Sequence, residues 1–212
     1  VNVLHDGEEM YGVTIKVAPL KSSGNTGIGQ HGDATATGYY QQKWLDPSIY
    51  PGTDGWSMGK DAVVIRYAEV LLTYAEAKNE LTGLDASAFD AVNQVRARVG
   101  MPALQDNDPS KPTYCATQDD LRQRIRNEWR VEFALEGGKR QWDVRRWGIA
   151  MDVLNKPRLG LKYEIIGDEC ILYQGSQQAV GEATAYKEHN YVYPVPQSEI
   201  DLNPNLTQNP GY

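Results

Sequence analysis

The chain has 212 residues and a formal net charge of −7, with 41% hydrophobic and 23% charged residues. This length fits one domain that can bury a sizeable core without metals or cross-links. The negative charge argues against partners that are held through phosphate groups, so nucleic acid and anionic lipid surfaces are poor candidates. No apolar run reaches the roughly 20 residues that a membrane-spanning helix needs.

The first 60 residues are predicted to be rich in strands and loops. Residues 11–19 alternate apolar and polar side chains, which is typical of a half-buried strand. A long loop rich in Gly, Ser and Thr follows, and a short strand is predicted at 39–45 before turns that carry Tyr50 and Trp56. Loops of this length in a compact domain usually have a function.

Residues 61–157 are predicted to be helical. Apolar residues recur at helical spacing over 61–83, and a second helix is predicted over 85–99. The short link between them makes the pair an antiparallel hairpin. A third helix is predicted from 117 to 137 and a fourth from 139 to 156, where Pro157 ends it. Such hairpins are similar to tetratricopeptide units.

The tail from residue 158 has a looser pattern. Residues 161–166 and 190–196 are predicted to form short strands, and the last residues a capped turn with an irregular end. Cys115 and Cys170 are consistent either with one disulfide or with two free thiols. No Cys/His spacing predicts a metal site, and no cofactor motif is present.

Three glutamates in the predicted third helix recur at four-residue spacing, and the sequence places cations just beyond a Gly-Gly turn. Paired carboxylates could form a glycosidase site. Neighbouring guanidinium groups, however, lower a carboxyl pKa, whereas an acid catalyst needs a raised one. We therefore expect a structural ion-pair network and no catalytic residue. The predicted network consists of Glu128, Glu132, Glu136, Arg140, Asp143, Arg145 and Arg146.

Four segments of the chain together resemble one family. They are "RYAEVLLTYAEAKNEL", "AVNQVRARVGMP", "LRQRIRNEWRVEFALEGGKRQWDVRRWG" and "YVYPVPQSEIDLNPNLTQNPGY". In this order they resemble the C-terminal part of the SusD/RagB family of Bacteroidetes outer-membrane nutrient-binding lipoproteins, from about Tyr11 to Tyr212. Trp129 departs from the pattern, because many members carry Arg there. "EGGKRQWD" departs from an acidic-Gly-x-Arg-x-x-Asp run.

The resemblance implies a mainly α fold, in which tetratricopeptide-like hairpins of an α–α superhelix pack with a loop-rich region containing a few short β-strands. It also implies a non-enzymatic protein of polysaccharide utilisation. Such a protein binds oligosaccharides at the cell surface and delivers them to a SusC-like TonB-dependent transporter in the outer membrane. The alternative is a peptide-binding or protein-interaction adaptor of the same fold. No cofactor or metal is implied.

We expect residues 1–212 to form one SusD-like C-terminal portion. Residues 1–60 would be the ligand region, 61–157 the helical region and 158–212 an irregular tail. The resemblance places the signal peptide and the lipid anchor in an N-terminal part that lies upstream of this sequence.

Ligand residues of this family lie on variable loops, so the candidates come from side-chain chemistry. An exposed aromatic ring can stack on the apolar face of a pyranose, and neighbouring polar groups can bind its hydroxyls. Trp56 is the first choice, although any one ring could instead anchor a turn in the core. The predicted ligand residues are Trp56, Tyr50, Trp44, Tyr39, Tyr40 and Asp54.

Overall fold

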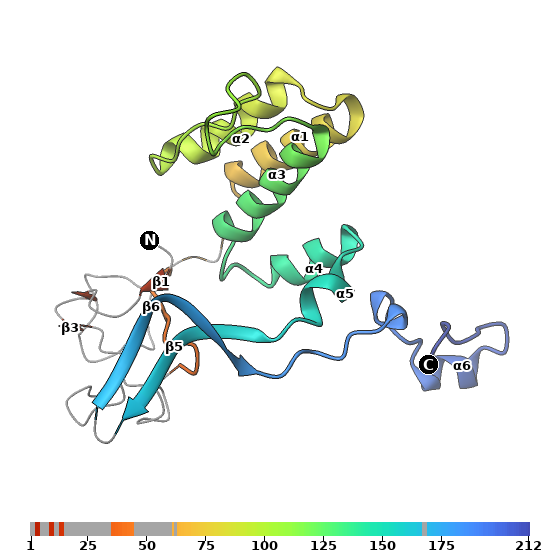
Figure 1. Cartoon of the computed structure of the whole chain (residues 1–212). Coiled ribbons are helices and arrows are strands. Elements are labelled where there is room, and N and C mark those ends of the chain that lie inside the picture. Colours follow the sequence, from red (N-terminus) through yellow and green to blue (C-terminus); the bar gives the residue numbers. More distant parts are fainter. Residues whose placement is uncertain are drawn as a thin grey trace. The chain divides into compact units, whose positions relative to one another are not determined.

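The structure is a computed structural model that describes residues 3–4, 9–10, 13–14, 35–44, 61, 63–166 and 169–212. Most of its elements are labelled in Figure 1. The chain divides into two units. One unit is Lys60–Arg140, and the other combines Val1–Gly59 with Gln141–Tyr212.

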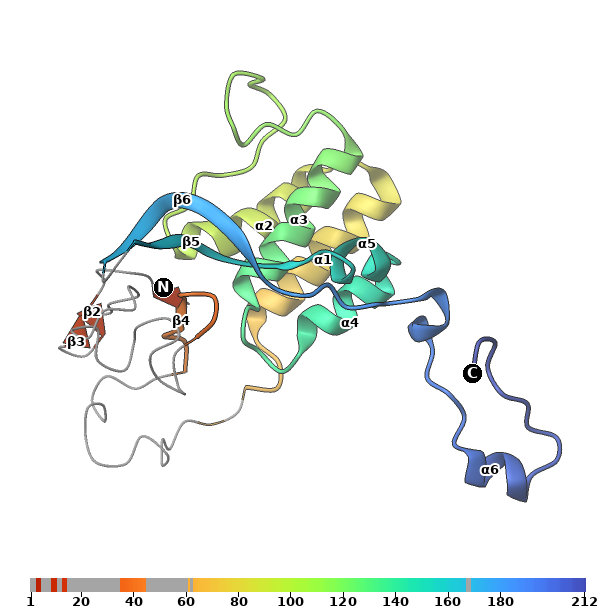
Figure 2. The ribbon, with the colours of Figure 1, turned by 60° about the horizontal axis from the view of Figure 1, so that its bottom comes forward.

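The unit Lys60–Arg140 contains three helices that lie side by side in Figures 1 and 2. They are α1 (Tyr67–Thr82), α2 (Ala86–Arg98) and α3 (Gln118–Glu132). Helix α1 contacts both α2 and α3. Leu72 and Leu121 are fully buried between these helices, because the apolar positions recur at helical spacing along one face.

Local hydrogen bonds set the ends of these helices. Helix α2 begins after Asp85, whose Oδ1 accepts from the backbone N–H of Ser87 at 2.8 Å. Thr117 and Asp120 form a capping box at the start of α3. Asn79 is buried and joins α1 to α3, since its Nδ2 donates to the Gln118 carbonyl at 3.1 Å.

The end of α3 differs from the sequence-based prediction. The predicted helix 117–137 already ends at Glu132. Leu135 has φ 64°, and Gly137 and Gly138 have φ 51° and 71°, so the backbone cannot continue a right-handed helix. Glu136 therefore lies in a turn, and the prediction of a three-glutamate row on one helix is wrong.

The predicted fourth helix is divided in two. Helix α4 covers Lys139–Arg146 and α5 covers Ala150–Leu154. Gly148 lies between them with φ 68°, a left-handed conformation that interrupts a helix. Within the second unit, Val144, Ala150 and Tyr186 form a buried cluster.

The sequence-based prediction found only part of a long β-hairpin. Strand β5 (Arg158–Ile166) includes the predicted strand 161–166 and pairs antiparallel with β6 (Glu169–Gly181), as Figure 1 shows. The predicted strand at 190–196 is wrong. A 3₁₀ helix, η2 (Glu188–Tyr191), begins that stretch, and the prolines at 194 and 196 cannot donate to a strand ladder. The segment predicted as a capped turn forms the short helix α6 (Gln197–Leu202), which has no side-chain cap.

Four short strands complete the described chain. Strand β1 (Val3–Leu4) pairs with β4 (Tyr40–Gln41), and β2 (Glu9–Met10) pairs with β3 (Val13–Thr14). The rest of the strand predicted at 11–19 lies outside the described residues. The prediction of a mainly α fold with helical hairpins and a few short strands is confirmed. Cys115 is a free thiol and is fully buried.

Candidate functional site

Half of the predicted ligand residues lie in one short segment of the described chain. This aromatic segment, residues 35–44, contains Tyr39, Tyr40 and Trp44. Trp56, Tyr50 and Asp54 lie outside the described residues, so their role stays a prediction. The aromatic segment is thus the part of the predicted ligand region that carries candidate rings among the described residues.

Hydrogen bonds hold the aromatic segment against strand β5. The backbone N–H of Leu161 donates to the Thr37 carbonyl at 2.9 Å. Gly160 permits this approach, because a Cβ there would lie 2.8 Å from the Thr37 Cα. The Thr35 hydroxyl donates to the Tyr39 carbonyl at 2.9 Å. The backbone that carries the rings is therefore fixed at both its turn and its strand.

The rings of the aromatic segment are half-buried, so each keeps part of its surface accessible. Burial raises the pKa of Tyr40, against the opposing hydrogen bonds from Thr35. Tyr40 is thus a neutral phenol that can both donate and accept a hydrogen bond. The ammonium of Lys43 lies 5.9 Å from the centre of the Trp44 ring.

Trp44 has an unusual backbone conformation. Its φ is 74°, in the left-handed region that non-glycine residues rarely adopt. Strain of this kind costs roughly 1–3 kcal/mol and is concentrated at ligand and active sites. Trp44 is therefore the described residue of this segment that we favour for ligand contact.

The glutamates that could have formed a catalytic pair contact arginines. Glu132 accepts two hydrogen bonds from Arg98 Nη2, both at 2.8 Å, and a further one from Arg66 Nη1. Glu136 accepts from Arg66 Nε at 3.0 Å and from Nη2 at 2.7 Å. Arg96 pairs with Glu128. The carboxylates thus lie in a charge-paired network within the helical unit.

Burial alone would lower the pKa of Arg66, but its hydrogen bonds to Glu136 and Glu132 outweigh this effect, and the pKa is raised. The guanidinium therefore stays charged. Arg66, Arg96 and Arg98 were absent from the predicted network. The two arginines in the last turn of α2, Arg96 and Arg98, were the sequence signal that could have predicted partners for the glutamates.

Two of the cations that were predicted beside the glutamates, Arg145 and Arg146, contact other groups. Arg145 lies over the rings of Trp142 and Tyr193, at 5.6 and 4.8 Å from their centres. Arg146 Nε donates to Asp143 Oδ1 at 2.9 Å, and Asp143 is buried. Arg140 belongs to α4. Arg145 and its rings therefore form a feature that is separate from the charged network.

The described residues contain neither a metal-binding cluster nor a membrane-spanning helix. Within this part of the chain, no group of three or more His, Cys, Asp or Glu side chains could hold a metal ion. No helix described by the structure combines the length and hydropathy needed to cross a bilayer.

The fold and the aromatic segment define a class: a mainly helical protein with tetratricopeptide-like hairpins, joined to small strand pairs that carry aromatic rings. The model of the SusD family matches residues 2–212. The chain belongs to the SusD family, also known as SusD/RagB, and the predicted resemblance is confirmed.

Relatives of known sequence and structure agree with this assignment. SusD-like protein P2 of Formosa agariphila is 32% identical over 164 residues, which cover 76% of this chain and 28% of that protein. A SusD-like carbohydrate-binding protein of Bacteroides fragilis has 29% identity and a TM-score of 0.73, over 97% of this chain and 40% of that one. A SusD homologue of Bacteroides thetaiotaomicron has 28% identity and a TM-score of 0.53, over 85% of this chain and 34% of that one. This chain thus spans well under half of the length of these relatives.

Proposed function

We propose that this chain is part of a non-enzymatic cell-surface protein that binds oligosaccharides and delivers them to a SusC-like TonB-dependent transporter. The observation that carries the proposal is family membership over nearly the whole chain. It is supported by the similarity to a solved SusD-like carbohydrate-binding protein of Bacteroides fragilis.

The aromatic segment supplies the proposed ligand contacts. A ring face such as that of Trp44 can stack on the C–H groups of a pyranose. The phenol of Tyr40 and the exposed amide of Gln41 can exchange hydrogen bonds with sugar hydroxyls. We further propose that Trp56, Tyr50 and Asp54 contribute to the same site, as their side-chain chemistry predicts.

The ion pairs of the helical unit support a role without catalysis. A glycosidase needs one carboxyl group that is held protonated by a raised pKa. Glu128 instead pairs with Arg96, and Glu132 pairs with Arg98, so both carboxylates are engaged within the helical unit. Incubation with polysaccharides should therefore release no shorter products. Turnover that Glu132→Gln abolishes would contradict this part of the proposal.

Substitutions at Trp44 test the ligand site. Trp44→Ala and Trp44→Gly both remove the ring, but Gly also relieves the left-handed backbone. Both variants should bind oligosaccharides about tenfold more weakly in calorimetry over a glycan panel, the equivalent of about 1.4 kcal/mol of stacking. The melting temperature of Trp44→Gly should not fall. Trp56→Ala tests the sequence-based first choice in the same assay.

A matched control removes a ring from another exposed position. Tyr67 on α1 has 68% of its surface exposed, and Tyr67→Ala should leave glycan affinity unchanged. Unchanged affinity in both Trp44 variants would remove this residue from the site. Tight binding of peptides together with no binding of any glycan would instead favour the adaptor function.

The transporter and the location can be tested in the bacterium. We propose that the full-length protein is lipid-anchored in the outer membrane through its N-terminal part. A tagged full-length protein should co-purify with a TonB-dependent transporter and should be cleaved by protease added to intact cells. Recovery in the cytoplasmic fraction would contradict the proposal.

A further inference from the structure

A second pair of accessible rings lies beside Arg145, away from the aromatic segment in sequence. Trp142 has 56% of its surface exposed and Tyr193 has 59%. Their ring centres are 6.5 Å apart, and the ring planes are tilted by 60°. The guanidinium of Arg145 lies 5.6 Å from the Trp142 ring and 4.8 Å from the Tyr193 ring. We call these three residues the arginine platform.

Arg145 differs from the arginines of the charged network. Arg66, Arg96 and Arg98 each contact a glutamate, whereas no carboxylate pairs with Arg145 among the residues that the structure describes. Its Nε is buried without a hydrogen-bond partner in this part of the chain. A guanidinium offers several donors in a planar fork that fits a carboxylate or a sulfate. Burial alone would lower the pKa of Arg145, but hydrogen bonds to Tyr193 and Tyr186 outweigh this effect, and the pKa is raised. The guanidinium therefore stays charged, and the donors that these phenols do not occupy can bind an anion.

The rings fix the position of this cation. A guanidinium over an aromatic face is attracted by the ring and loses part of its rotational freedom. Arg145 also lies 5.9 Å from the ring of the buried Tyr186, so three rings surround it. An anion that binds Arg145 would meet a cation that is already oriented, which reduces the entropy cost of binding.

The surroundings of the platform are locally basic. Helix α4 has the sequence KRQWDVRR, in which four cations accompany one aspartate. The chain as a whole carries a net charge of −7. Two of these cations are ion-paired, Lys139 with Glu69 and Arg146 with Asp143. Charges more than about 8 Å away are largely screened at physiological ionic strength, so Arg145 itself is the cation that acts on an anion bound at the platform.

We propose that the arginine platform binds an anionic sugar residue. The pyranose ring would stack on Trp142 or Tyr193, and its carboxylate or sulfate would accept hydrogen bonds from Arg145. This inference rests on the proposed function of glycan binding and extends it to acidic glycans. Uronate and sulfated sugars share the chemistry that the platform recognises.

Calorimetry with three oligosaccharides of equal length tests the inference. The ligands are an oligogalacturonate, a sulfated carrageenan fragment and a neutral malto-oligosaccharide. The wild-type chain should bind at least one anionic ligand more tightly than the neutral one, with an affinity that falls as salt is added. The anionic ligand that is preferred distinguishes a carboxylate from a sulfate as the recognised group.

Substitutions separate the two parts of the platform. Arg145→Gln should weaken binding of the anionic ligand about tenfold or more and leave neutral-sugar binding unchanged. Arg145→Lys keeps the charge but loses the planar fork, so it should fall between the wild type and Arg145→Gln. Trp142→Ala should weaken binding of the anionic ligand at every salt concentration. Circular dichroism checks that each variant is folded.

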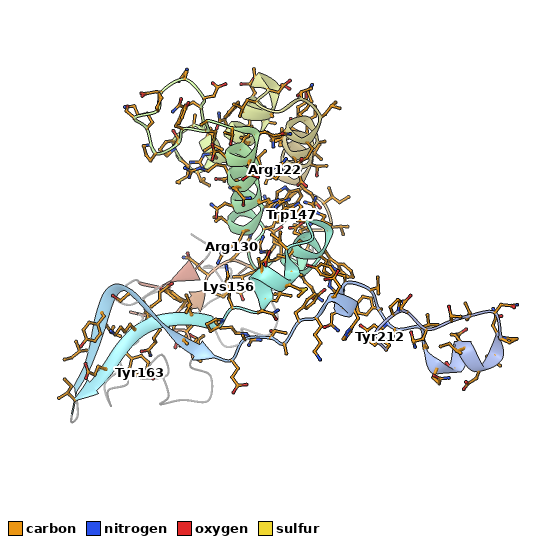
Figure 3. All side chains as sticks on the ribbon, turned by 45° about the vertical axis from the view of Figure 1, so that its right-hand side comes forward. Arg122, Arg130, Trp147, Lys156, Tyr163 and Tyr212 are labelled. Carbon is orange, nitrogen blue, oxygen red and sulfur yellow. The ribbon has the colours of Figure 1, made fainter. Side chains whose placement is uncertain are left out.

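Arg130→Gln is the matched control, because Arg130 is exposed near the end of α3 and the substitution removes one positive charge (Figure 3). It should leave all affinities unchanged. An equal loss in Arg130→Gln and Arg145→Gln, or no loss in either, would overturn the inference. Binding of neutral but not anionic glycans would overturn it while the proposed function stands. No binding of any glycan would contradict both.

Discussion

Replacing Arg66 with alanine should destabilise the helical unit by breaking ion pairs to two nearly buried carboxylates. Arg66 precedes α1 and donates to Glu136 at 3.0 and 2.7 Å, to Glu132, and to the Glu132 carbonyl at 2.8 Å. The side chains of Glu132 and Glu136 are only 10% and 6% exposed. The substitution would leave both nearly buried carboxylates without this guanidinium.

The expected magnitude follows from the burial of the partners. Breaking a buried ion pair from one side costs about 3–5 kcal/mol. The Arg66 side chain is 25% exposed, which places the expected loss near the lower limit, about 3 kcal/mol. Arg98 pairs with the same Glu132, but its side chain is 59% exposed. Arg98→Ala should therefore cost less than about 1 kcal/mol.

Urea unfolding followed by circular dichroism measures both variants. A double-mutant cycle of Arg66→Ala with Glu136→Gln isolates the pair, because the double variant no longer contains a charged Glu136 to be left uncompensated. The double variant should be more stable than the sum of the two single losses predicts. Equal losses for Arg66→Ala and Arg98→Ala, or additive losses in the cycle, would refute the assignment of buried charge pairing to Arg66.

Three further outcomes are expected. Gly160→Ala should loosen the aromatic segment and weaken glycan binding, because the new Cβ would lie 2.8 Å from the Thr37 Cα. Calorimetry measures the glycan affinity, and amide hydrogen exchange measures the protection of residues 35–44. Exchange equal to that of the wild type would contradict this prediction. Hydrogen bonds from Ser87 lower the Asp85 pKa from 3.8 to about 2. Asp85 therefore contributes stability above pH 3.8, and this contribution is lost as the pH falls through 2. Asp85→Asn should remove this pH dependence of stability, as measured by acid unfolding followed by circular dichroism. Burial raises the Cys115 pKa, so iodoacetamide should modify this thiol only after denaturation. Rapid labelling of Cys115 in the folded chain, located by peptide mass spectrometry, would contradict its full burial.

Helix positions were predictable where periodicity and end signals coincide. Thr117 caps α3 as its sequence position predicts, and Gly83 follows α1 with φ 78°. The end of α3 was not predictable, because Leu135 takes a left-handed conformation that leucine does not signal. A single such residue moves Glu136 off the helix.

Strand β6 shows a different limit. Much of its second half is polar, with the sequence QGSQQ over residues 174–178. This polar run has no alternation of apolar and polar residues for a pattern to detect. Pairing with β5 stabilises it instead, through backbone hydrogen bonds that depend little on the side chains.

The residue types of the candidate site come from the sequence and stay a prediction, whereas its contacts come from the structure alone. Rings in Gly-rich and Pro-rich segments indicated where a ligand could stack, and Tyr39, Tyr40 and Trp44 do lie together on a fixed backbone. The partner of Glu136, by contrast, is 70 positions away in the sequence. No local pattern specifies a contact over that separation.

The role of each arginine in this chain depends on whether the fold brings it a carboxylate. Arg145 and Arg146 are adjacent in α4, have the same chemistry and follow the same glycine turn. Arg146 bonds to the buried Asp143 three residues earlier, so part of its donor capacity is used within the helix. Arg145 faces three rings and retains donors for an external anion. A helix turns by about 100° per residue, and this single step separates a structural cation from one that is available to a ligand.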